Sequence, residues 1–256
     1  MIEEKTALQI VSNIINKFYD DAIHPPAQEL GYVMGRIAYS LRLIGLIGLV
    51  GDGAIITENI LKEKMENFLY TAFSKTPNEK RVLPDPTIIC PLLENVANSF
   101  NKKDIVNLYS NLLSAATNED TIDKVHPAFI NIISQMDPLD AKIFYELSPS
   151  FSAVSCIILD NEPDSVYNIY LNDNLIKENF IPSAISIKNL ERLGLISLPD
   201  GIGFFIEDAN DALINKFKQS NYYKELTNKY DKKNISISSQ PGYITNLGKQ
   251  FKNICL

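Results

Sequence analysis

The sequence predicts a mainly α-helical protein in which an N-terminal helical bundle is followed by a small α+β, winged-helix-like C-terminal domain. Apolar residues recur at spacings of three and four through the first half of the chain, the period of helices with one buried face. Further on, short β-favouring runs alternate with helical segments. We expect three parts: residues 1–80 with N-terminal helices and a glycine-rich hairpin, residues 81–150 as a helical core, and residues 151–256 as the winged-helix-like domain.

The composition is that of a globular protein. The chain has 256 residues, of which 45% are hydrophobic and 21% charged, and this excludes disordered and collagen-like proteins. Cys90, Cys156 and Cys255 form no CxxC pair, so we expect neither a disulfide framework nor a zinc cluster. No signal peptide opens the chain, which favours a cytoplasmic protein.

The N-terminal helices are predicted one after another. Residues 5–22 form the first, which ends before His24-Pro25-Pro26 because proline cannot continue a helix. A second begins near Ala27, and residues 74–84 form a polar, proline-bounded loop. A third helix lies between the second helix and this loop, and its apolar face carries Leu61, Met65, Phe68, Leu69 and Ala72.

Two aspartate-proline pairs predict helix starts in the central part. In Asp85-Pro86 and Asp137-Pro138 the aspartate supplies an N-cap oxygen, and the proline already has a helical φ angle. Residues 105–116 form a helix between them. We expect its polar stripe to face solvent; the stripe consists of Asn107, Ser110, Asn111 and Ser114.

The C-terminal part mixes strands and helices. We expect a helix that opens at Pro182-Ser183 and ends at Gly194, where a left-handed residue is favoured. Residues 195–198 and 202–206 are expected to form a β-hairpin, and Thr245 is expected to cap the last helix. Further β-favouring runs are residues 157–159, 166–171 and 235–237.

The glycine-rich stretch at residues 43–56 carries no phosphate-binding motif. It has neither the lysine and hydroxyl of a P-loop nor the GxGxxG spacing of a dinucleotide fold, so we expect no cofactor. Arg42 and Asp52 offset the apolar residues around them, so we expect no constitutive membrane span. Insertion of residues 43–56 into a membrane after a trigger remains an alternative.

No catalytic or metal-binding set is recognisable. His24 and His126 each precede a proline and have no local ligand spacing, so we expect His126 to cap or pack against the start of a helix. Asp137, Asp140 and Lys142 fit the first turns of a helix, where acidic side chains are favoured. We therefore expect no metal site and no enzymatic activity.

The basic residues near the C-terminus offer one alternative. Residues 181–256 carry a formal charge of +3, whereas residues 1–180 carry −10, within a total of −7. Lys188, Asn189 and Arg192 would be the nucleic-acid-binding residues if the winged-helix-like part contacts DNA. The excess is small for a phosphate-binding face.

Four motifs in the central part resemble the Abi-alpha (abortive infection alpha) family of bacterial proteins; they lie at residues 81–86, 108–116, 125–130 and 136–142. Residues 189–196 and 243–251 are similar to the end of that family. Asp137 stands where family members often have serine, which keeps the N-cap. The motif positions, which we interpret as mainly structural, are Asn111, His126, Pro127, Phe129, Asp137, Pro138 and Asp140.

The resemblance implies a bacterial, cytosolic protein linked to phage defence by abortive infection, with no established enzymatic activity, and it names no catalytic residues. We therefore expect a non-enzymatic interaction protein whose partner is a host or phage protein. A nucleic-acid-binding regulator and a membrane-perturbing effector acting through residues 43–56 are the alternatives. The sequence predicts no particular oligomeric state.

Overall fold

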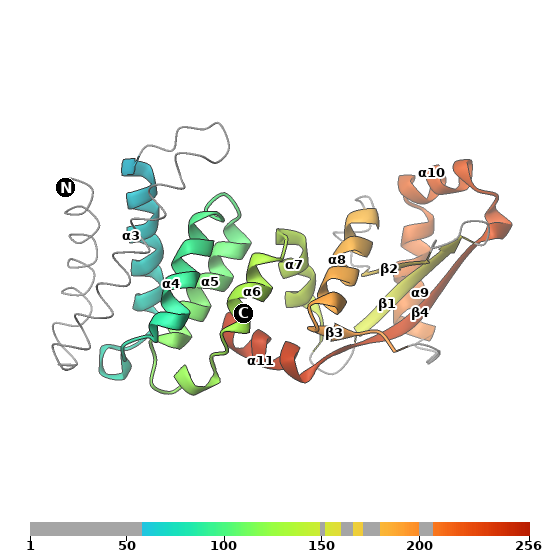
Figure 1. Ribbon diagram of the computed structural model, residues 1–256. Helices are drawn as coiled ribbons and strands as arrows, with labels where there is room; N and C mark the ends of the chain where they lie inside the picture. Colours follow the sequence, from blue (N-terminus) through green and yellow to red (C-terminus); the bar gives the residue numbers. More distant parts are fainter. Residues whose placement is uncertain (1–57, 149–151, 160–165, 171–179, 200–206) are drawn as a thin grey trace. The chain divides into compact units, whose positions relative to one another are not determined.

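The computed structural model describes residues 58–148, 152–159, 166–170, 180–199 and 207–256 (Figure 1). The chain divides into two compact units, Met1–Gln135 with Asn253–Leu256, and Met136–Lys252. The first two predicted helices and the glycine-rich stretch at residues 43–56 lie outside the described residues. The division into three parts stays a prediction.

Four described helices build the first unit, and α5 packs against the other three. Phe129 of α6 and Tyr109 of α5 are fully buried where these helices meet. The core therefore follows the predicted apolar faces. The helices are α3 (Glu58–Ser74), α4 (Pro86–Ala97), α5 (Lys103–Ala116) and α6 (Ala128–Ser134), with short 3-10 turns at Asn78–Lys80 and Ile122–Lys124.

The predicted helix starts and apolar faces of this unit are confirmed. Asp85 Oδ1 accepts hydrogen bonds from the backbone nitrogen and hydroxyl of Thr87, at 2.7 and 2.8 Å, and Pro86 is the first residue of α4. In α3, Met65, Phe68, Leu69 and Ala72 are all buried. Local capping and helical periodicity therefore determine these two elements.

The polar stripe of α5 is fully exposed only at Asn107, so the prediction that the whole stripe faces solvent was wrong. Ser110 is buried, and the hydroxyl of Thr76 donates to the carbonyl oxygen of Ser114 at 3.2 Å. Of the four predicted positions, Asn107 is exposed, while Asn111 and Ser114 are partly buried. The stripe packs against the polar segment that follows α3, and helical periodicity cannot distinguish such a segment from water.

The second unit combines helices with a four-stranded antiparallel sheet of order β2-β1-β4-β3. The central pair is β1 with β4, in register from Ser152 opposite Gly242 to Leu159 opposite Ile235. The strands are β1 (Ser152–Leu159), β2 (Val166–Ile169), β3 (Ile196–Ser197) and β4 (Ile235–Ile244). The helices are α7 (Pro138–Glu146), α8 (Phe180–Arg192), α9 (Glu207–Lys218), α10 (Asn221–Lys229) and α11 (Asn246–Cys255), whose last three residues belong to the first unit.

The helices α9 and α10 cover part of this sheet, and the sequence analysis did not predict them. Phe217 of α9 and Leu226 of α10 are buried in one cluster with Ile169 of β2. Ser220 caps α10 by accepting from the backbone nitrogen of Tyr223 at 3.2 Å. The cap and the apolar positions are visible in the sequence, but they stand among many charged residues.

Gly194 ends α8 as predicted, with a φ of 73°. The backbone nitrogen of Leu195 donates to the carbonyl oxygen of Leu190 at 3.0 Å, and that of Gly194 donates to Glu191 at 2.9 Å. These two bonds form a Schellman motif, which requires a left-handed residue at this position. Thr245 caps α11 as expected, because its hydroxyl oxygen accepts from the backbone nitrogen of Gly248 at 2.9 Å.

The predicted mainly helical fold with a small sheet in its C-terminal part is confirmed. The runs at residues 157–159 and 235–237 lie in β1 and β4, and β2 covers Val166–Ile169 of the predicted run 166–171. The second arm of the predicted hairpin, residues 202–206, lies outside the described residues. Within the described sheet, β3 pairs with Tyr243 and Ile244 of β4. The winged-helix-like arrangement stays a prediction.

Candidate functional site

His126 caps the start of α6, as the sequence predicts. Its Nδ1 accepts a hydrogen bond from the backbone nitrogen of Ala128 at 3.1 Å. Its exposed ring lies 6.1 Å from the ring of Phe129, centroid to centroid, and Pro127 occupies the N-cap position between them. The lone pair of His126 Nδ1 is therefore used by the helix rather than by a substrate.

Asp137 and Asp140 form a capping box at the start of α7. The Asp137 carboxylate accepts from the backbone nitrogen of Leu139 at 3.3 Å, and the Asp140 carboxylate accepts from the backbone nitrogen of Asp137 at 2.8 Å. Pro138 is the first helical residue. Asp140 is only 2% exposed, so its negative charge is held inside the second unit by hydrogen bonds and by the helix N-terminus.

Asn189 extends this network from α8. Its Nδ2 donates to Asp140 Oδ2 at 2.7 Å, and its Oδ1 accepts from Arg192 Nε and Nη2 at 3.1 and 2.8 Å. The amide thus relays between a buried carboxylate and an exposed guanidinium. Lys188 points outward and pairs with Glu191 at 2.8 Å. The structure brings Asn189 and Arg192 together, and nucleic-acid binding by these residues stays a prediction.

Lys252 holds the other end of α7, and the sequence analysis missed it. Its Nζ lies 3.1, 2.8 and 2.6 Å from the carbonyl oxygens of Phe144, Tyr145 and Leu147, which are acceptors at the helix C-terminus. It also lies 5.6 Å from the centroid of the Phe144 ring. Burial lowers the pKa of Lys252. α7 therefore has a carboxylate at its first turn and an ammonium at its last, as the helix dipole favours.

A second group of polar contacts lies in the first unit, around the partly buried Asn111. Lys75 Nζ lies 2.6 Å from Asn111 Oδ1 and 2.9 Å from Ser110 Oγ, and Asn111 Nδ2 donates to the carbonyl oxygen of Cys255 at 2.9 Å. Burial lowers the pKa of Lys75. A lysine beside a serine hydroxyl is a pair used in acyl transfer. Ser110 is 2% exposed, however, which leaves no room for a substrate carbonyl at its oxygen.

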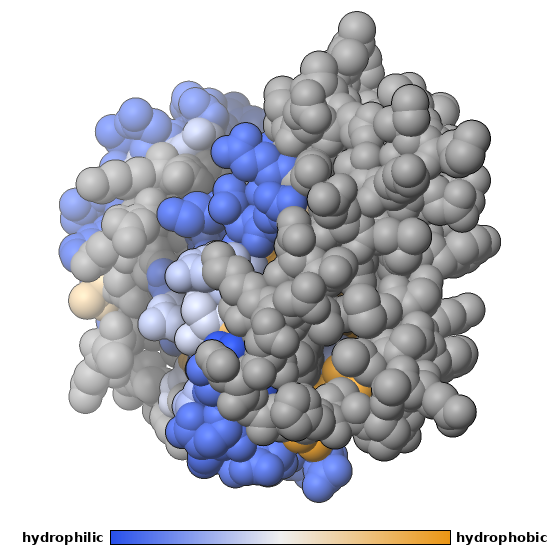
Figure 2. All heavy atoms as spheres, turned by 90° about the vertical axis from the view of Figure 1, so that its left-hand side faces the viewer, coloured by the Kyte–Doolittle hydropathy of each residue, from blue (hydrophilic) through white to orange (hydrophobic). Residues whose placement is uncertain are grey.

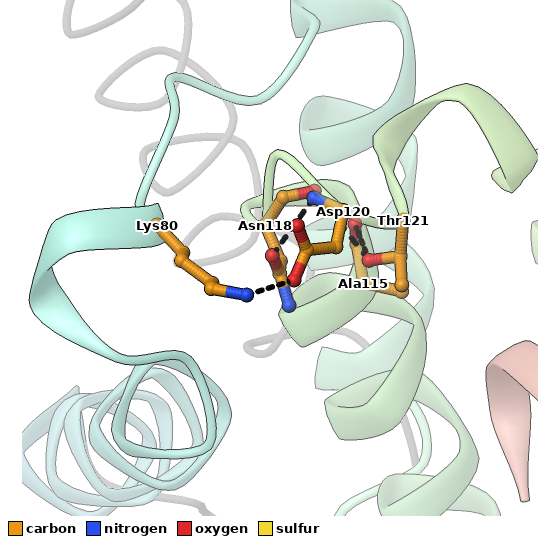
Figure 3. A network of polar contacts seen from close by, with 5 residues as sticks. All are labelled: Lys80, Ala115, Asn118, Asp120 and Thr121. Atoms are coloured by element: carbon orange, nitrogen blue, oxygen red, sulfur yellow. Dashed lines mark hydrogen bonds and ion pairs between the residues drawn. The ribbon is translucent and has the colours of Figure 1, made fainter.

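Figure 3 shows polar contacts within residues 115–121 of the first unit, and the ion pair that joins this segment to Lys80. Lys80 forms an ion pair with Asp120, and this hydrogen bond and charge raise the pKa of Lys80. The backbone nitrogen of Asp120 donates to Asn118 Oδ1 at 3.0 Å, and the hydroxyl of Thr121 donates to the carbonyl oxygen of Ala115 at 2.8 Å. These groups bond one another, so the network fixes loop geometry.

The outward stripe of α8 carries two large, exposed aliphatic residues one helical turn apart. Ile181 and Ile185 are 45% and 64% exposed, and Lys188 follows them on the same side of the helix. On the face shown in Figure 2, by contrast, hydrophilic residues cover most of the described surface. The sequence signal for this stripe is the i, i+4 pair of isoleucines before two basic residues.

The described residues contain no group of three histidine, cysteine, aspartate or glutamate side chains that could hold a metal ion. In the same part of the chain, no helix is long and apolar enough to cross a membrane. Cys90 and Cys255 are both buried, and burial raises the pKa of the Cys255 thiol. A protonated, buried thiol is a poor nucleophile.

A comparison with protein families finds a match over most of the chain. A family model described as abortive infection alpha matches residues 56–255, which is most of the chain. Neither the comparison with curated proteins nor that with solved structures finds a match.

Proposed function

Because the chain belongs to the abortive infection alpha family, we propose that it acts in phage defence by abortive infection, as a non-enzymatic, cytoplasmic protein that binds a host or phage protein. The family match supports the link to abortive infection. The contacts of the motif residues support the non-enzymatic part of the proposal.

The observation that carries the proposal is the use of the motif side chains within the fold. Asn111 bonds Lys75 and the backbone of Cys255, and His126 caps α6. Asp137 and Asp140 cap α7. Reactive groups in an active site need to face a substrate, whereas these groups face their own backbone or neighbouring side chains. A protein of this kind acts through its surface.

The proposal is tested by infection. A strain with the gene and a matched deletion strain are challenged with a panel of phages at low and high phage-to-cell ratios. Abortive infection predicts fewer phage released per infected cell at low ratio, and death of the infected cells at high ratio, in the strain that has the gene. Equal phage release from both strains across the panel would contradict a defence role.

Partner binding needs its own experiment. The tagged full chain is purified after crosslinking from infected and uninfected cells, and co-purified proteins are identified by mass spectrometry. Each partner is then made recombinantly and titrated against the purified chain. Absence of direct binding by every recombinant partner would contradict the proposed mode of action.

Nucleic-acid binding is the second candidate, because Lys188 and Arg192 are both exposed on α8. The full chain is titrated with a fluorescent DNA duplex at about 50 mM and about 200 mM salt, since phosphate contacts make affinity fall steeply with salt. Weakening on Lys188→Glu together with a steep salt dependence would favour this candidate over protein binding.

A further inference from the structure

A groove lies between α8 and β2 in the second unit. It is open to solvent, has a volume of about 430 Å³, and is lined by Tyr167, Asn168, Ile181, Ala184, Ile185 and Lys188. This volume lies in the lower part of the range for ligand sites, about 300–1,000 Å³. The groove therefore has room for a few side chains of a partner.

One wall of the groove is apolar and exposed. Ile181 and Ile185 stand one helical turn apart, at 45% and 64% exposure. Large aliphatic side chains in water are unfavourable, and their burial against a partner would release free energy in proportion to the apolar area covered. This favours an occupant with apolar side chains.

The end of the groove is cationic. Lys188 lines it, and Arg192 lies one turn further along α8. The ion pair of Lys188 with Glu191 is exposed, and exposed pairs contribute little stability, so a carboxylate on a partner can share or replace Glu191. The charge at this end therefore favours an acidic residue in the occupant.

The groove is held in shape from behind. The hydroxyl of Ser183 bonds both the backbone nitrogen and the carbonyl oxygen of Tyr170, at 3.1 and 3.2 Å, which ties α8 to the end of β2. Ile187 and Leu190 of α8 are fully buried. A rigid groove loses little conformational entropy when it binds a partner.

From these observations we infer that the groove between α8 and β2 binds a short peptide segment of a partner protein. The segment places apolar side chains against Ile181 and Ile185 and a carboxylate beside Lys188. This inference rests on the proposed function, because it assigns the surface through which the protein binds its partner.

The test uses the full chain and a defined probe. Short random peptides displayed in a library are selected on the immobilised protein, and the enriched peptides are synthesised with a fluorescent label and titrated by polarisation. The inference predicts enrichment of peptides that combine apolar residues with an acidic residue. Ile185→Asp should weaken their binding about tenfold or more, as for an apolar anchor at the centre of an interface.

Charge reversal tests the cationic end separately. Lys188→Glu should weaken binding about fivefold, and a peptide whose acidic residue is changed to lysine should recover affinity for this variant. Matched controls are Tyr145→Asp, since Tyr145 is 65% exposed on α7, and Lys224→Glu on α10. Both controls should bind the selected peptides like the unaltered chain. Circular dichroism and thermal unfolding confirm that each variant is folded.

Three outcomes would overturn the inference. One is enrichment of no peptide, and another is equal binding by folded Ile185→Asp. The third is a dimer in light scattering that Ile185→Asp converts to monomer, which would assign the groove to a second copy of the chain. The peptide assay needs no phage. If the gene gives no protection in the infection assay, the proposed function is wrong, but the peptide results still test the groove.

Discussion

Asn189 links a buried negative charge to an exposed positive one. The Asp140 carboxylate is 2% exposed, and Asn189 is its side-chain donor, at 2.7 Å. A buried carboxylate without its donors has a large desolvation cost. Asn189 therefore stabilises the fold because its amide nitrogen, and not its amide oxygen, faces the Asp140 carboxylate.

Asn189→Asp should lower the free energy of unfolding by about 1–3 kcal/mol or more, because it places two carboxylates against each other. Urea unfolding of the variant and the unaltered chain measures the difference. Asp140→Asn in the same chain should restore only part of the loss: an amide nitrogen in place of Asp140 Oδ2 donates to the new carboxylate, but the backbone nitrogen of Asp137 loses the oxygen it bonds. Equal stability of the single and double variants would contradict this network.

Gly248 is required by close approach of backbone rather than by its φ angle. A Cβ at this position would overlap the carbonyl oxygen of Leu195 and lie 2.8 Å from the side chain of Ile244. Gly248→Ala should therefore lower the free energy of unfolding by about 1–3 kcal/mol, although alanine favours a helix. Thermal unfolding measures this change. The exposed Gln250→Ala in the same helix should be neutral or stabilising, and stabilisation by Gly248→Ala would contradict the packing.

At the level of helices and strands, Lys252 shows how one side chain can complete another helix. Lys252→Met keeps the length of the side chain but leaves the carbonyl oxygens of Phe144, Tyr145 and Leu147 without this donor. We expect a loss of about 1–3 kcal/mol in the free energy of unfolding, measured in urea. Lys249→Met, on the exposed side of the same helix, is the control and should change stability little. If Lys252→Met left the free energy of unfolding unchanged, this would show that water replaces the ammonium as the donor to these carbonyl oxygens.

Elements whose signals are local could be predicted from the sequence. Asp85-Pro86 and Asp137-Pro138 start α4 and α7, and Gly194 ends α8, because a cap or a left-handed residue acts within one turn. The capping function of His126 was predictable for the same reason. Among the site residues, the roles that could be predicted were therefore those of side chains that cap the helix next to them in the sequence.

Contacts between distant residues could not be predicted in the same way. Asn111 lies 36 residues from Lys75 and 144 from Cys255, so the polar stripe of α5 looked solvent-facing. The partner of Asn189 is 49 residues away. The same polar periodicity fits a solvated face and a buried polar contact, and tertiary packing decides between them.

For the chain as a unit, the buried titratable groups predict a loss of stability in strong alkali. Burial raises the pKa of the Tyr109 hydroxyl and of the Cys255 thiol. Above their ordinary pKa values of 10.0 and 9.0, the unfolded chain loses these protons while the folded chain keeps them, so the free energy of unfolding falls as pH rises. Burial lowers the pKa values of Lys75 and Lys252, so these two groups make the free energy of unfolding rise with pH. This rise ends at about pH 10.5, where the lysines of the unfolded chain have also lost their protons.

We therefore expect the free energy of unfolding to fall with pH above 10.5, the ordinary lysine value. Tyr109→Phe should reduce this slope by about 1.4 kcal/mol per pH unit, the amount for one proton. Urea unfolding at a series of alkaline pH values measures the slope. Adding Cys255→Ala should reduce the slope further, and an unchanged slope in Tyr109→Phe would contradict the burial of the phenol.

The first unit is discontinuous in sequence, and this matters during synthesis. The first unit includes Asn253–Leu256, and the acceptor of Asn111 is the backbone of Cys255. At elongation rates of about 5–20 residues per second, the ribosome needs about 6–24 s to pass from residue 135 to residue 253. During that interval the nascent first unit lacks its last segment, with Ile254 and Cys255 not yet in the core. Ribosome-associated chaperones would therefore meet an incomplete surface for many seconds.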